Sequence, residues 1–91
     1  MMLKQEEIRQ VLEASLLASG EPISIDRMMN LFEMGQLPEG SARQALRNAL
    51  GEIESALKDH AYELKRVSSG YRFQIRQDFS PWVSRLWAER P

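Results

Sequence analysis

Hydrophobic residues recur every three to four positions in several stretches of the chain, and in one stretch the period changes to two. Spacings of i, i+3, i+4 and i+7 mark one face of an amphipathic helix. They predict helices over residues 4–19, 41–59 and 79–89. Alternation with period two marks a strand with one buried face, and it predicts a β-hairpin over 62–77 around a turn that contains Gly70.

Residues that are favoured at the ends of helices indicate a further short helix. Asp26 is expected to cap a second helix over 27–33, and Ser41 is expected to cap the third. The alternating residues 23–25 are either an edge strand or an extended connection. Gly51 lies inside the third helix at a cost of about 1 kcal/mol relative to alanine, which indicates tight packing there.

This order of elements is that of a winged helix. The predicted fold is α+β and mainly helical, with a helix-turn-helix, a β-hairpin wing over 62–77 and a C-terminal helix over 79–89. A length of 91 residues suits one domain, which we place at residues 4–91.

The residue inventory argues against catalysis. The chain has no cysteine and one histidine, His60, so a cysteine zinc site, a thiol nucleophile and a Ser-His triad are all excluded within one chain. No glycine pattern resembles a phosphate loop. We therefore expect no catalytic residue, no metal, no cofactor and no enzyme activity. No apolar run approaches the ~20 residues that span a membrane, and the N-terminus lacks a secretory signal, which together predict a cytoplasmic protein.

Charge is distributed unevenly along a chain whose net charge is −1. Residues 1–40 carry three basic and seven acidic side chains, whereas residues 41–91 carry nine basic and six acidic ones. A protein with two such halves can present its basic face to DNA or to an acidic protein, or can pair with a second copy of itself.

The last helix carries the candidate protein interface. Its apolar face has two interpretations: Trp82 and Val83 close the core of the wing, or an exposed remainder binds a protein partner through aromatic anchors. The candidate interface residues are Phe79, Trp82, Leu86 and Trp87.

An alternative hypothesis is a winged-helix transcription regulator that binds DNA. The third helix of such a module enters the major groove, where Arg43, Gln44 and Arg47 would lie. Arg66 and Arg72 of the wing, with Lys65 and Arg76, would contact the DNA backbone. The other interpretation of these wing cations is that charged outward positions protect a sheet edge from aggregation.

Three runs, residues 12–24, 61–76 and 81–91, resemble the segregation and condensation protein B family in sequence and in order. They contain the elements Ala-Ser-Gly-Glu-Pro, Gly-Tyr-Arg and Glu-Arg-Pro. The resemblance implies a non-catalytic accessory subunit of the bacterial condensin complex, which acts in chromosome condensation and segregation at the nucleoid. Such proteins are two tandem winged helices that form homodimers chiefly through the first. They bind a kleisin subunit, which joins the structural-maintenance-of-chromosomes ATPase; any contact with DNA is expected to be weak or indirect.

Two features depart from that family pattern. The loop over 34–40 is longer than the usual short link, and the chain stops at Pro91, where the family continues into its second winged helix. The chain is therefore expected to be an N-terminal fragment or an unusually short member. Homodimerisation is the family property that we expect it to keep, rather than direct kleisin binding on its own.

Overall fold

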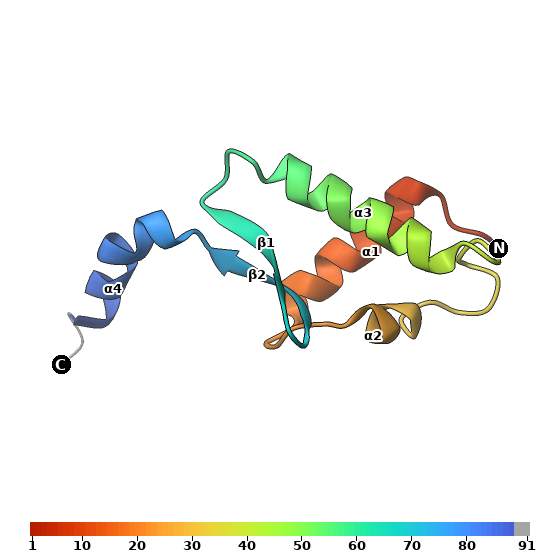
Figure 1. Ribbon diagram of the computed structural model, residues 1–91, viewed down its shortest axis with the longest axis horizontal. Helices are drawn as coiled ribbons and strands as arrows, with labels where there is room; N and C mark the ends of the chain where they lie inside the picture. Colours follow the sequence, from red (N-terminus) through yellow and green to blue (C-terminus); the bar gives the residue numbers. More distant parts are fainter. Residues whose placement is uncertain (89–91) are drawn as a thin grey trace.

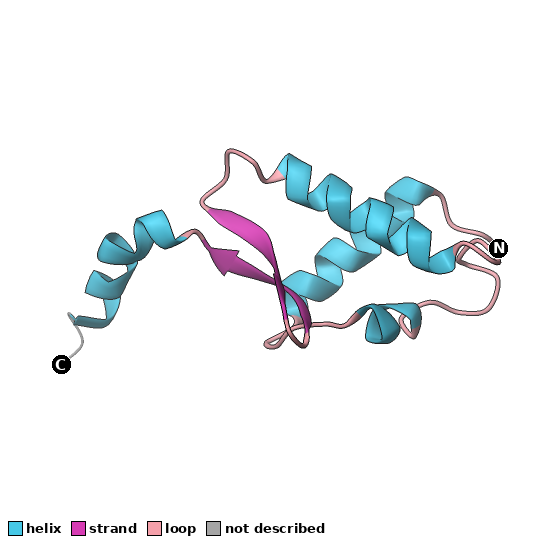
Figure 2. Ribbon diagram, in the orientation of Figure 1, coloured by secondary structure: helices cyan, strands magenta, loops and turns pink. Residues whose placement is uncertain are grey.

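The structure, a computed structural model, describes residues 1–88, and its elements follow the predicted order (Figures 1 and 2). The elements are α1 (Gln5–Ala18), α2 (Ile25–Met29), α3 (Ala42–Ala56), β1 (Tyr62–Val67), β2 (Gly70–Ile75), the 3-10 turn η1 (Gln77–Phe79) and α4 (Ser80–Ala88). Helices joined to an antiparallel hairpin in this order confirm the α+β class and the winged-helix arrangement. Residue 89, the predicted end of the last helix, lies outside the described residues.

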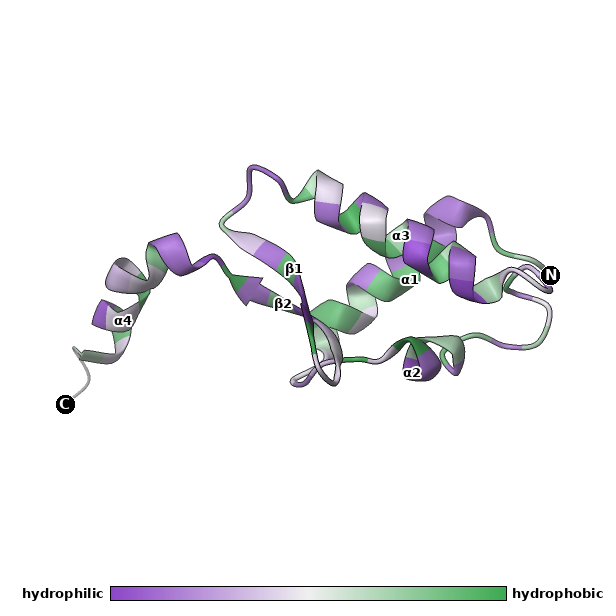
Figure 3. Ribbon diagram, in the orientation of Figure 1, coloured by the Kyte–Doolittle hydropathy of each residue, from purple (hydrophilic) through white to green (hydrophobic). Residues whose placement is uncertain are grey.

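The core lies between α1 and α3, with α2 and β1 closing it. The helical spacing of both long helices places their apolar residues on facing sides, and hydrophobic positions recur along each of them in Figure 3. The buried side chains of the core are Ile8, Leu12, Leu16, Ile23, Met28, Ala45, Leu46, Ala49, Leu50, Ile53, Leu57 and Leu64. Among residues 1–88, no side chain after Leu64 belongs to this buried set.

An isolated β-bridge joins the hairpin to the segment between α1 and α2. Leu64 pairs with Phe73, and Val67 pairs with Gly70 across a two-residue turn. On the far side of β2, Ile23 and Tyr71 exchange two backbone hydrogen bonds, with N···O distances of 2.8 and 2.9 Å. Residue 23 therefore pairs with the edge of the wing, as the edge-strand alternative for residues 23–25 predicts.

The prediction of an Asp26 cap was wrong, whereas Ser41 occupies the predicted N-cap position of α3. α2 begins at Ile25, and the hydroxyl of Ser24, rather than Asp26, accepts the hydrogen bond from the Arg27 amide at 3.1 Å. Asp26 instead lies in the first turn, where its carboxylate favours the positive end of the helix dipole. Ser41 precedes α3 but makes no side-chain capping bond, and α3 ends at Ala56, before the predicted Asp59.

The tight packing predicted at Gly51 is absent. Gly51 is exposed, and a β-carbon built on it would have no atom outside its own helix and chain neighbours within 4 Å. Gly51 therefore lowers the stability of α3, and within the described residues no packing contact compensates for that loss.

The last helix extends away from the rest of the chain. α4 lies beyond the open end of the hairpin, while the N-terminus lies at the opposite end of the molecule (Figure 1). The chain measures 52 × 25 × 22 Å, with a radius of gyration of 15.5 Å. A compact chain of this length would have a radius of gyration of about 12 Å. The elongation means that α4 does not close the core, so the core interpretation of Trp82 was wrong; its side chain is 63% exposed.

Candidate protein interface

An exposed apolar face begins at Phe79 and continues along α4. Positions 79, 82 and 86 follow the i, i+3, i+7 spacing that puts them on one side of a helix. Phe79 is 39% exposed, Trp82 63% and Leu86 65%. We call these three residues the α4 surface; Trp87, 59% exposed, lies beside it. All four predicted interface residues are thus accessible to a partner.

Local interactions hold the start of α4 in place. Phe79 and Trp82 contact each other with ring centroids 6.3 Å apart, across the junction of η1 and α4. Pro81 occupies the first turn, where its missing amide hydrogen is tolerated. Ser84 donates its hydroxyl hydrogen to the Ser80 carbonyl at 2.8 Å. These contacts orient the helix, but they leave the α4 surface open.

Packing against a partner would stabilise α4. Helices shorter than about 12 residues are marginal in water unless one face is packed, and the described part of the chain shows nine residues of α4. Burying a large apolar side chain yields about 1.5–3 kcal/mol. A protein that covered the α4 surface would therefore stabilise the helix and gain affinity from the same side chains.

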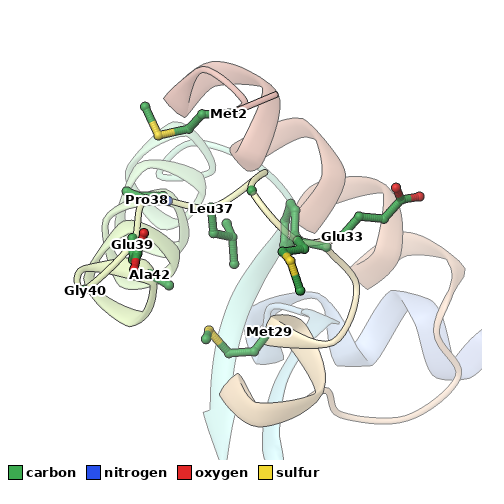
Figure 4. A pocket seen from close by; sticks show the side chains of 11 residues that line it. Met2, Met29, Glu33, Leu37, Pro38, Glu39, Gly40 and Ala42 are labelled. Carbon is green, nitrogen blue, oxygen red and sulfur yellow. The ribbon is translucent and has the colours of Figure 1, made fainter.

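A second apolar surface lies at the other end of the molecule, in a groove between α2, the loop that follows it and the N-terminus. The groove has a volume of ≈ 590 Å³. Its hydrophobic lining residues are Met2, Met29, Phe32, Met34 and Leu37, and we call it the methionine groove. Figure 4 shows Leu37 between Met2 and Met29 in its view of the groove. Met34 is 100% exposed and Met2 62%.

The periodicity of the sequence does not indicate this groove. The methionines near residues 28–34 stand out as surplus apolar groups, but nothing in the periodicity joins them to Met2 or Leu37. The joining contact is a backbone hydrogen bond from the Leu3 amide to the Gln36 carbonyl at 2.9 Å. It ties the N-terminus to the loop, and a contact over that sequence separation has no local signal.

Four of the five predicted DNA-binding residues line two grooves that share Arg47. Arg43, Gln44 and Arg47 line a shallow groove along α3, and Arg47 also lines another with Arg66 beside the hairpin turn. Arg72 lines neither groove; its guanidinium donates to the Gln74 side-chain oxygen at 3.2 Å.

Two of the α3 candidates are also engaged by other side chains. Arg43 forms an ion pair with Asp26 of α2, which offsets its charge. Gln44 donates to the Asn48 side-chain oxygen at 2.8 Å.

Arg76 has a structural role that the sequence did not indicate. Its guanidinium donates hydrogen bonds at 2.8 Å to the carbonyls of both Leu57 and His60, just past the end of α3. It also lies 3.4 Å from a carboxylate oxygen of Glu63. Arg76 thus caps the end of α3 and fixes the hairpin to it.

Two further observations bear on function within residues 1–88. No group of three or more histidine, cysteine, aspartate or glutamate side chains is placed to hold a metal ion. In the same residues, none of the helices has the length and apolar character required to cross a membrane.

Comparisons with known proteins agree with this architecture. The sequence model of the family described as segregation and condensation complex subunit ScpB matches residues 10–91. A segregation and condensation protein B homolog from Coxiella burnetii is 42% identical over 81 residues. That alignment covers 89% of this chain but 37% of the relative, so the chain spans little more than a third of the relative's length.

Two solved structures share the fold. ScpB from Mycobacterium tuberculosis has a TM-score of 0.79 at 26% identity, and the match covers 98% of this chain and 52% of that one. A conserved hypothetical protein from Chlorobium tepidum has a TM-score of 0.71 at 20% identity, with 92% of this chain and 50% of that one covered.

Proposed function

The chain belongs to the family of segregation and condensation complex subunit ScpB, and from that membership we infer a homodimerising, non-catalytic scaffold. In this proposal the chain acts in chromosome condensation and segregation as part of a bacterial condensin-type complex, in the cytoplasm at the nucleoid. Its complex would contain a kleisin subunit and the structural-maintenance-of-chromosomes ATPase. The contribution of these residues themselves is self-association.

The α4 surface is the observation that carries the proposal. Phe79 at the end of η1 and Trp82 and Leu86 on α4 are exposed apolar residues at helical spacing, and a helix of the described length is marginal in water without a packed face. Aromatic residues on exposed apolar patches are typical anchors of protein interfaces. A second copy of the chain is present whenever the first is, which makes a symmetric homodimer the simplest way to cover the surface.

The solution mass tests this proposal directly. We expect light scattering on a size-exclusion column to give twice the 10.5 kDa chain mass over a hundredfold range of concentration. A monomer at every concentration would overturn the homodimer. Duplex DNA binding by that monomer at ~50 mM salt, lost as salt rises, would then support the DNA-binding alternative, because phosphate contacts are strongest at low salt.

A matched pair of substitutions assigns the surface. Leu86 on α4 and Leu17 on α1 are both 65% exposed leucines in helices. We expect Leu86→Asp to shift the mass toward the monomer, since it places a charge within a buried apolar contact, and Leu17→Asp to leave the dimer intact. Equal dimer strength in both variants would remove Leu86 from the interface.

A further inference from the structure

We propose that the methionine groove of one copy receives α4 of the second copy, and that the exchange is reciprocal, so that the two chains lie antiparallel. This inference rests on the proposed homodimer and adds the surface on which α4 docks. It makes a dimer with two identical contacts, one at each end, related by a twofold axis.

The positions of the two surfaces favour exchange between chains. α4 lies at one end of the 52 Å axis, and the N-terminus and the loop that form the methionine groove lie at the other (Figure 1). A helix at one end cannot fill a groove at the opposite end of its own chain while the core stays intact. Two copies placed side by side in opposite directions bring each α4 to the other copy's groove. A twofold axis makes both contacts at once and leaves no open end for further association.

The two surfaces match in size and chemistry. A volume of ≈ 590 Å³ falls within the range of roughly 300–1,000 Å³ that holds a compact ligand, and a few side chains of one helix face have a similar bulk. Methionine side chains are flexible and polarisable, and their sulfur atoms contact aromatic rings favourably. The groove offers Met2, Met29 and Met34, and the α4 surface brings Phe79 from η1 and Trp82 from α4.

Charges at the edges of the two surfaces are complementary. Glu33 and Glu39 line the methionine groove, and no lysine or arginine does. Within residues 80–88 the sole charged side chain is Arg85. At 100° per residue Arg85 borders the α4 surface next to Trp82. An apolar centre with oppositely charged rims is the usual anatomy of a specific interface.

Cross-linking between single-cysteine variants tests the contact, because the chain has no cysteine of its own. Met34→Cys places a thiol at the groove and Leu86→Cys places one on α4; both sites are exposed, so the fold should tolerate them. The two variants are mixed and treated with a bis-maleimide that spans about two helical turns, roughly 10 Å. We expect the major product to join one chain of each kind. The matched control replaces Met34→Cys with Leu17→Cys, which should give at least tenfold less of the joined product.

The double variant Met34→Cys, Leu86→Cys tests the reciprocity. We expect a covalent dimer closed by two links, with no larger species. A ladder of higher oligomers would overturn the twofold arrangement, and a cross-link within one chain would show that α4 folds back onto its own body. Either result contradicts the proposal.

The light-scattering mass separates this inference from the proposed function. A dimeric mass together with links only between two Leu86→Cys chains, or with no links at all, would overturn docking in the groove and leave the homodimer standing. A monomeric mass at every concentration would overturn both.

Discussion

Gly70 and Ile23 meet backbone to backbone: a β-carbon on Gly70 would lie 2.4 Å from the carbonyl carbon and oxygen of Ile23. Gly70 also has a φ of 142°, a value that residues with side chains rarely adopt. The contact lies beside the two hydrogen bonds between residues 23 and 71 that fasten the wing to the segment between α1 and α2. A residue with a side chain at position 70 would therefore separate the wing from the helical part.

We predict that Gly70→Ala destabilises the chain by more than about 2 kcal/mol, since backbone strain of about 1–3 kcal/mol adds to the clash with Ile23. Urea unfolding followed by far-ultraviolet circular dichroism, at one fixed protein concentration, measures the change. Gly51→Ala is the matched control. Position 51 is helical and open, so the same change there should stabilise by about 0.5–1 kcal/mol. Equal effects at both positions would contradict the close approach.

Arg76 is expected to matter for stability rather than for nucleic-acid binding. Arg76→Ala removes the hydrogen-bond donors to the Leu57 and His60 carbonyls. It should lower the free energy of unfolding, measured by urea unfolding, by about 1–3 kcal/mol. Arg76→Lys should recover only part of this loss, because an ammonium group cannot reproduce the guanidinium fork. Arg72 is exposed and donates to the half-buried Gln74, so Arg72→Ala should change the free energy of unfolding by less than about 0.5 kcal/mol. A cost for Arg72→Ala equal to that for Arg76→Ala would refute the capping role.

The two serines that precede helices should respond differently to the same substitution. Ser24 accepts the Arg27 amide hydrogen, so Ser24→Ala should lower the free energy of unfolding by about 1 kcal/mol. Ser41 makes no such bond, and Ser41→Ala should change it by less than about 0.5 kcal/mol. Urea midpoints of the two variants, compared at constant m-value, provide the test. A larger loss for Ser41→Ala would restore the sequence-based assignment of its cap.

Periodicity predicted the elements that bury a regular face. The apolar stripe of α3 is buried in the structure, and Leu64 and Phe73 lie on the inner face of the hairpin. The alternation fails at the end of β2, where Ile75 is 51% exposed and Gln74 is half-buried. The caps were less predictable. Ser24 and Asp26 are both strong capping residues two positions apart, and local preference alone does not separate them.

The parts that escaped prediction depend on contacts between distant residues. The spacing of residues in α4 identifies an apolar face but does not say what covers it. For that reason the sequence was also compatible with a buried Trp82, which the structure shows to be exposed. Arg76 reaches carbonyls that lie 16 and 19 positions away, once the hairpin has placed it at the end of α3. The methionine groove likewise exists only after Leu3 has bonded to Gln36.

The separation of α4 from the core has a consequence for optical measurements. Both tryptophans of the chain, Trp82 and Trp87, lie on this one helix, outside the buried core. Their fluorescence is consequently a built-in reporter of the surroundings of α4. Its emission wavelength follows hydration of the helix, while the melting of α1 against α3 is followed by circular dichroism. The chain thus carries separate spectroscopic signals for association and for folding, without any added dye.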